Sequence, residues 1–156
     1  MSLGWPSVLV STSQGINRLF IVIFVSLLAL GASAKEYGDV VVSEVRTIYD
    51  GDTFRANING WPAVVGESMS IRIKGIDTPE LRGKCQSEKE AARLAKQYSV
   101  AKLRAANRVE LKAIERGKYF RLLADVWVDD ENLGEALISA GHAVRYGGGK
   151  KKDWCT

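Results

Sequence analysis

Residues 71–80 read IRIKGIDTPE, a stretch that begins as a β-strand and ends in an acidic loop. Period-two alternation places Arg72 on the polar face of that strand, opposite the apolar face. Gly75 then breaks the strand, and Asp77 and Glu80 follow on either side of a Thr-Pro pair. The alternating residues are Met69, Ile71 and Ile73 on one face and Ser70, Arg72 and Lys74 on the other. The stretch predicts a half-buried strand that leads directly into two carboxylates.

A second acidic turn lies upstream. Residues 41–56 alternate, are rich in β-branched side chains and are interrupted by Asp50-Gly51-Asp52, which predicts a hairpin with a tight turn. If its strands neighbour the one that ends at Asp77, the carboxylates of Asp52 and Asp77 converge at one rim. Converging carboxylates and the carbonyl of Thr78 are the oxygen ligands that Ca²⁺ takes. The residues alone leave open that both acidic segments serve only as turns.

The remaining pattern predicts the order of the elements. Ser87-x-x-Glu90 is a capping-box pattern and indicates a helix from Glu88 to about Ala106. Two strands follow, at 109–114 and 120–128, and then Asn132 caps a short helix over 133–140. Three strands, a long helix, two strands and a short C-terminal helix are typical of the OB-fold, a five-stranded barrel. The predicted fold class is therefore α+β, mainly β.

The first 34 residues have the features of an export signal. No charge precedes Arg18, residues 19–30 are apolar, and Ala32-Ser33-Ala34 is a small-residue cleavage pattern. The apolar run is shorter than the roughly 20 residues that span a bilayer. We predict a signal peptide over 1–34 cleaved after Ala34, one domain over 35–156, a periplasmic or secreted location, and no stable membrane association. An uncleaved membrane anchor is the alternative.

Charge and cysteine content limit the possible partners and compartments. The chain has 156 residues and a net charge of +4, too mild an excess to identify a nucleic-acid partner by itself. We expect the run Lys150–Lys152 to be a solvated basic tail, and attraction of the nucleic-acid backbone is the alternative. An exported chain matures in an oxidising compartment, so a Cys85–Cys155 disulfide is the default prediction and two free thiols are the alternative. Such a loop stabilises a fold by up to about 4 kcal/mol in the chain-entropy model.

Three separated motifs together resemble one protein family. DGDT (50–53), IRIKGIDTPE (71–80) and KYFR (118–121) occur in this order on the predicted elements. They resemble the staphylococcal nuclease, or thermonuclease, family over about residues 42–146. The resemblance implies a Ca²⁺-dependent nuclease that hydrolyses DNA and RNA with low sequence specificity and leaves 3′-phosphate products. It implies these roles: Asp52, Asp77 and the Thr78 carbonyl as Ca²⁺ ligands, Glu80 as general base, and Arg72 and Arg121 as ligands of the scissile phosphate.

The resemblance also predicts the substrate groove. It assigns Lys118, Tyr119 and Tyr146 to nucleotide binding, and we expect single strands to be preferred because their bases are exposed for stacking. We also expect a monomer. One departure is Phe120, which stands where the family commonly has glycine and could alter how Arg121 is presented. The alternative function is a non-catalytic nucleic-acid-binding module; because every implied acid and arginine is present, the sequence favours the enzyme.

Overall fold

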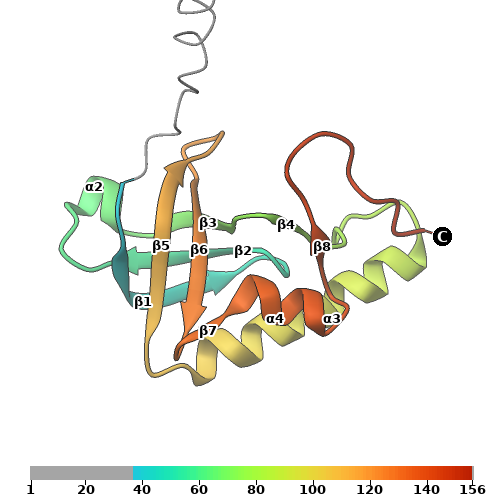
Figure 1. Cartoon of the computed structure of the whole chain (residues 1–156), viewed down its shortest axis with the longest axis horizontal. Coiled ribbons are helices and arrows are strands. Elements are labelled where there is room, and N and C mark those ends of the chain that lie inside the picture. The colour runs from blue at the N-terminus through green and yellow to red at the C-terminus, as the bar shows by residue number, and fades with distance from the viewer. Residues whose placement is uncertain (1–36, 156) are drawn as a thin grey trace, which may run out of the picture. The chain divides into compact units, whose positions relative to one another are not determined.

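The computed structural model describes residues 37–155, so the predicted signal peptide lies outside the described residues. Its main sheet has six strands, of which five form a barrel and the short β7 is the sixth. Figure 1 shows how these strands are arranged. Neighbouring strands pair antiparallel in the order β3-β2-β1-β5-β6, and a parallel pairing of β3 with β6 closes the sheet into a barrel. The bounds are β1 Val40–Ile48, β2 Thr53–Ile58, β3 Met69–Ile73, β5 Val109–Arg116 and β6 Leu122–Val128. The predicted five-stranded OB-fold barrel is confirmed.

Smaller elements complete the chain around the barrel. The short helix α2, Ala63–Gly66, lies between β2 and β3. Beyond the barrel, β4, Ile76–Asp77, pairs antiparallel with β8, Val144–Arg145, in a separate two-stranded sheet. The strand β7, Glu131–Asn132, pairs with β6. The β4–β8 pairing matters for function because it joins the acidic loop after β3 to the C-terminal segment.

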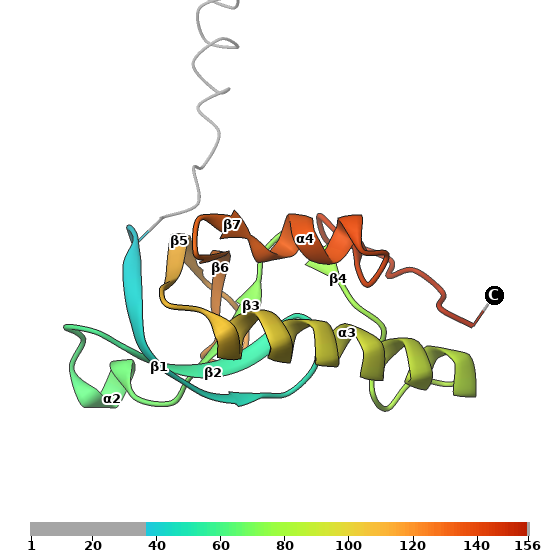
Figure 2. The same ribbon diagram turned by 90° about the horizontal axis from the view of Figure 1, so that it is seen from below.

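The long helix α3, Gln86–Ala105, connects β3 and β4 to β5, as predicted (Figure 2). Its start differs from the prediction. Cys85, in an extended conformation, is the N-cap, and its sulfur accepts the backbone N–H of Glu88 at 3.5 Å. The expected capping box at Ser87 is wrong, because the helix begins earlier than expected and Ser87 lies within its first turn. One face of α3 is buried, through Ala92, Ala95, Ser99 and Leu103.

The short C-terminal helix is α4, Leu133–Ser139. The Asn132 side chain accepts the backbone N–H of Glu135 at 3.0 Å, which confirms the predicted N-cap. Gly141, with a φ of +75°, follows the end of the helix in the left-handed conformation that glycine adopts readily. No helix within residues 37–155 is both long enough and apolar enough to cross a membrane.

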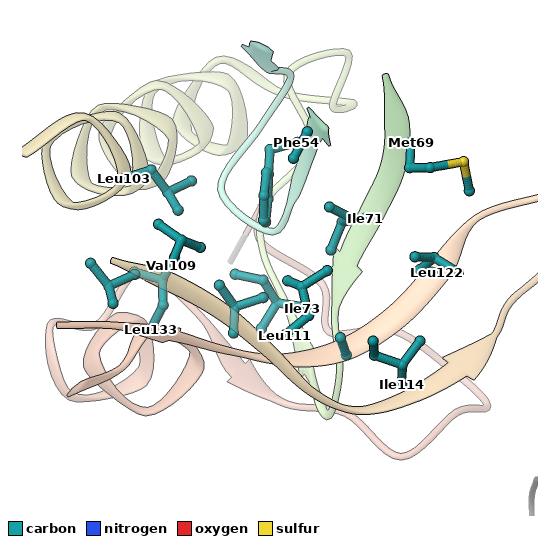
Figure 3. Close-up of a cluster of buried hydrophobic side chains, with 14 of the residues drawn as sticks. Phe54, Met69, Ile71, Ile73, Leu103, Val109, Leu111, Ile114, Leu122 and Leu133 are labelled. Atoms are coloured by element: carbon teal, nitrogen blue, oxygen red, sulfur yellow. The ribbon is translucent and has the colours of Figure 1, made fainter. Parts of the chain in front are cut away.

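The barrel interior and the inner faces of both helices share one hydrophobic core (Figure 3). On β3 the buried residues alternate with Ser70 and Arg72, as the sequence predicted. Leu103 of α3 and Leu133 of α4 join the barrel side chains. Fully burying an aliphatic or aromatic side chain contributes roughly 1.5–3 kcal/mol. Large buried members include Phe54, Ile71, Leu111, Ile114 and Leu122. This packing fixes the strands whose ends carry the acidic residues.

Candidate active site

The hairpin turn after β1 is packed against the rest of the molecule. Asp50 and Asp52 are buried, and the backbone N–H of Asp52 donates to the Asp50 carboxylate at 3.2 Å. A Cβ at Gly51 would lie 2.8 Å from the Ala95 Cβ and 2.9 Å from a Thr78 methyl carbon. The Ser99 hydroxyl on α3 donates to the Gly51 carbonyl at 2.6 Å. Because the turn has no side chain at its centre, it fits between α3 and the loop after β4.

Arg72 joins the two aspartates predicted as metal ligands. Its guanidinium donates to the Asp52 carboxylate at 2.6 Å and to the Asp77 carboxylate at 3.3 Å. Both carboxylates are almost fully buried, whereas the Arg72 side chain is 15% exposed. The predicted convergence of Asp52 and Asp77 is therefore present. The resemblance assigns Arg72 to the scissile phosphate, whereas in this structure it contacts both acids directly.

One oxygen of this cluster has no partner. The Asp77 Oδ2 atom is buried and accepts no hydrogen bond from any described residue. An unpaired buried carboxylate oxygen costs free energy unless a cation or donor satisfies it. The buried Thr78 follows directly in the chain, and carboxylate and carbonyl oxygens are ligands suited to a hard divalent ion. These residues fit a bound divalent cation.

Glu80 lies on the loop between β4 and α3, and its side chain is 49% exposed. The loop is held by Glu88 in the first turn of α3, which is buried. The Glu88 carboxylate accepts the backbone N–H of Lys84 at 2.8 Å and that of Glu80 at 3.4 Å. A Cβ on Gly83 would lie 2.3 Å from the Glu88 carboxyl carbon. Glu88 thus fixes the backbone of the loop that presents Glu80.

The structure adds a residue that sequence reasoning missed. Lys151 donates to the Asp77 carboxylate at 2.9 Å and to the Glu80 carboxylate at 2.6 Å. Partial burial lowers the pKa of Lys151, but its hydrogen bonds to Glu80 and Asp77 outweigh this, so the pKa lies above its ordinary value. The expectation of a solvated tail is wrong for this residue. The run of three lysines gave no signal that distinguished Lys151 from its neighbours.

A groove of about 1060 Å³ opens above the acidic cluster. Its lining combines cationic and aromatic side chains with Asp50 and Glu80. Arg121, just before β6, belongs to the lining, and its Nε is buried without a hydrogen-bond partner among residues 37–155. The predicted site residues that line the groove are Arg72, Glu80, Lys118, Arg121 and Tyr146. Lys96 from α3 and Lys151 add two cations that the sequence did not single out.

Two aromatic residues precede Arg121 outside the groove. Tyr119 is 90% exposed, is not part of the groove lining and has a φ of +58°. Phe120 has a φ of +56°, a region where glycine is unstrained, which fits the glycine expected there by resemblance. Its ring lies 4.2 Å from the Arg116 guanidinium carbon. Phe120 therefore lies outside the groove, and Arg121 still lines the groove.

Asp50 has a raised pKa. Burial raises the pKa of Asp50, and the nearby Asp52 carboxylate raises it further, to about 7. Like charges held close together in a buried turn disfavour the second ionisation. Asp50 lines the groove. A carboxyl that titrates near neutrality thus lies beside the predicted cation ligands.

The predicted disulfide is present: Cys85 and Cys155 are bonded, with Cα atoms 5.9 Å apart. Over residues 37–155, the only group of three or more potential metal-binding side chains within 4.8 Å is Cys85, Glu88 and Cys155. Both sulfurs of that group are used in the disulfide, so it offers no thiolate to a metal. The candidate cation site is instead the pair Asp52 and Asp77, on the separate observation that the Asp77 Oδ2 atom is buried without a partner among the described residues.

The comparisons agree with this geometry. A search of curated proteins found no match. A scan of protein families matched residues 70–153 to the family described as staphylococcal nuclease homologue. The match covers β3, the acidic loop, Arg121 and Lys151, and it spans more than half of the chain. The structure has a closed five-stranded barrel and two buried aspartates bonded to Arg72, which lines the groove. Together with the family match over more than half of its length, this shows that the chain belongs to the staphylococcal nuclease homologue family.

Proposed function

We propose that this protein is a Ca²⁺-dependent nuclease that hydrolyses phosphodiester bonds in DNA and RNA. The observation that carries the proposal is the bridge from Arg72 to both buried aspartates, Asp52 and Asp77, at the groove that Glu80 and Arg121 also line. The arrangement supports the proposal because a carboxylate and two guanidiniums line one groove, and one of those guanidiniums is bonded to two further, buried carboxylates. Membership of a nuclease family supports the same reaction class.

The roles follow from the chemistry of each side chain. Arg72 and Arg121 each carry a guanidinium, whose planar fork of donors matches phosphate oxygens. They hold the scissile phosphate and stabilise charge as it develops. Glu80, which is half-exposed, accepts a proton from the attacking water. Asp52, Asp77 and the Thr78 carbonyl would hold the divalent cation, which supplies Lewis-acid stabilisation of the phosphate.

The groove supports binding of a polynucleotide with little base specificity. Lys118 and Lys96 offer ammonium groups to neighbouring phosphates, and Tyr146 offers an aromatic ring for stacking. Such contacts carry little sequence information, and they favour single strands because unpaired bases expose their faces. Tyr119 at the exposed hairpin tip reaches substrate only where a strand extends beyond the groove. We propose 3′-phosphate products, as the family resemblance implies.

We further propose that the mature protein acts as a monomer in the periplasm or after secretion, once residues 1–34 have been removed. The signal-like pattern of residues 18–34 supports this location. The Cys85–Cys155 disulfide supports it too, because structural disulfides persist mainly in oxidising compartments.

A chelator-controlled digestion assay tests the proposal. The purified protein is incubated with single-stranded and double-stranded DNA and with RNA, with added Ca²⁺ or with excess chelator. We expect cleavage only with Ca²⁺, faster on single strands, and products whose ends are converted to 3′-hydroxyl by a 3′-phosphatase. A non-catalytic binding module would shift the oligonucleotide in a gel without shortening it, and this result would refute the enzyme.

A further inference from the structure

The C-terminal segment, residues 146–155, which we call the strap, runs from the end of β8 to the start of α3 (Figure 1). At its start, the backbone N–H of Tyr146 donates to the Gly75 carbonyl at 2.8 Å, directly after the β4–β8 pairing. At its end, Cys155 is bonded to Cys85 at the start of α3. Both anchors flank residues 76–85, the stretch that carries Asp77 and Glu80. The strap therefore has its two ends fixed on either side of the candidate cation site.

Contacts inside the strap shape its path between these anchors. The Tyr146 hydroxyl donates to the Gly149 carbonyl at 2.9 Å. Gly148 and Gly149 have φ values of +101° and +89°, which glycine adopts without strain. Near the second anchor, the Lys152 ammonium lies 4.2 Å from the centre of the Trp154 ring. These features set where Lys151 lies, four residues before the disulfide.

Lys151 uses oxygens that the proposed function assigns to metal binding and proton transfer. Its ammonium contacts the Asp77 carboxylate, of which the other oxygen is the unpartnered Oδ2 atom, and it contacts Glu80. A cation bound at Asp77 would lie next to this ammonium, and the like charges would repel. The Lys151 side chain is 43% exposed, so it can leave toward solvent without opening the core. The Lys151 ammonium and a divalent ion therefore compete for the carboxylates of this site.

We propose that Lys151 is an intramolecular competitor of the divalent cation, and that the Cys85–Cys155 disulfide keeps it at the site. This inference rests on the proposed function for the existence of the cation site. With a tethered competitor, the apparent Kd for the cation equals the intrinsic Kd divided by the fraction of molecules in which the site is free of the competitor. The tether also keeps the effective concentration of the ammonium high, which a free tail of the same sequence would not do.

Calcium titration by isothermal calorimetry tests the proposal without measuring cleavage. Ca²⁺ is titrated into the oxidised wild-type protein, Lys151→Met and Lys150→Met, with near-ultraviolet circular dichroism as the folding check. If Lys151 occupies the site about nine-tenths of the time, its removal lowers the apparent Kd for Ca²⁺ about tenfold. Lys150→Met removes the same charge from the neighbouring position, so it corrects for the general electrostatic effect and is expected to change Kd less than about twofold.

The tether is tested by combining substitutions. Cys85→Ser with Cys155→Ser removes the disulfide and leaves a hydroxyl at the N-cap of α3, a role that serine fills well. We expect this double variant to bind Ca²⁺ more tightly than wild type, and adding Lys151→Met to it to give a smaller further gain than in the oxidised protein. Equal gains in both backgrounds would overturn the role of the disulfide.

The outcomes separate the inference from the proposed function. Tighter Ca²⁺ binding by Lys151→Met than by Lys150→Met supports the inference. Ca²⁺ binding that Lys151→Met leaves unchanged or weakens overturns it and leaves the cation site intact. If Lys151→Met leaves Ca²⁺ binding unchanged or weaker and also binds a single-stranded oligonucleotide more weakly, Lys151 is a phosphate ligand instead of a competitor. No Ca²⁺ binding by any of the proteins overturns the proposed function and the inference together.

Discussion

The Arg72 guanidinium and the Asp52 carboxylate lie 2.6 Å apart although 20 positions separate them in the chain. The antiparallel register of β2 and β3 produces this contact, because it pairs Arg72 with Thr53, the residue next to Asp52. The same guanidinium reaches Asp77, which follows four residues after β3 ends. One arginine thus pairs with two buried carboxylates, of which Asp77 also contacts Lys151, and the loss of Arg72 has a large predicted effect.

Arg72→Ala is expected to destabilise the protein by about 3–5 kcal/mol, because it leaves the buried Asp52 carboxylate without its cation and Asp77 with Lys151 alone. Arg72→Lys keeps one charge but loses the fork that joins both acids, so it should lie between wild type and alanine. Urea denaturation without added metal measures both. A loss below about 1 kcal/mol for Arg72→Ala would show that the pair behaves as an exposed ion pair, contrary to this interpretation.

Glu80→Gln is expected to lower turnover roughly 10²-fold or more, the scale of losing a general base. Stability should change little, because the Glu80 side chain is half-exposed. Glu67→Gln, on an exposed residue outside the groove lining, is the matched control for removing one negative charge. Initial rates on a fluorescent oligonucleotide give the comparison. Equal rates for the two variants would remove Glu80 from the chemistry.

Glu88→Gln tests whether the buried carboxylate positions the loop that carries Glu80. The amide group of glutamine cannot accept both backbone N–H groups, so we expect a loss of about 1–3 kcal/mol in unfolding free energy. We also expect lower kcat with KM nearly unchanged, because the groove remains while Glu80 shifts. Glu90→Gln alters an exposed acid on the same helix and should stay within about 0.5 kcal/mol. A change in KM alone would contradict the positioning role.

Gly51→Ala places a methyl group against Ala95 and Thr78 in a turn that cannot move without displacing α3. Overpacking of this kind typically costs about 1–3 kcal/mol. Gly147→Ala is the control, because no atom lies within 4 Å of a Cβ at that position and its φ is not positive. Thermal unfolding of the two variants gives the difference. Equal melting temperatures would show that the turn adapts.

Asp129 links stability to pH at the junction of α3 and β5. Backbone N–H groups of Asn107 and Arg108 donate to its carboxylate at 3.0 and 2.8 Å and lower its pKa below the ordinary 3.8. Because the folded-state pKa is the lower one, this stabilisation is present above 3.8 and is lost as the pH falls through the folded value. Asp129→Asn should therefore be less stable than wild type near neutrality. The two curves of stability against pH should converge in acid; parallel curves would contradict the assignment.

Local patterns were enough to predict most of the architecture. Period-two alternation in β3 predicted its buried face, and Asn132 predicted the start of α4, because both depend on residues close in the chain. The start of α3 was misplaced because Cys85 competes with Ser87 for the N-cap. The position of the N-cap depends on the Cys85–Cys155 disulfide and on the hydrogen bond from the Lys84 backbone N–H to the Glu88 carboxylate. The Ser-x-x-Glu pattern contains neither interaction.

The sequence was enough to predict an OB-fold barrel with Asp52 in a hairpin turn and Asp77 after the third strand. This was possible because strand periodicity and turn chemistry depend on residues that are close in the chain. Only the tertiary structure decided which charges meet there. Barrel closure and the β2–β3 register bring Arg72 to Asp52 and Asp77, and the C-terminal segment, which is bonded to Cys85 through Cys155, carries Lys151 to Glu80. Ion pairs between residues 20 to 74 positions apart depend on how the chain closes in space, and no local pattern records that distance.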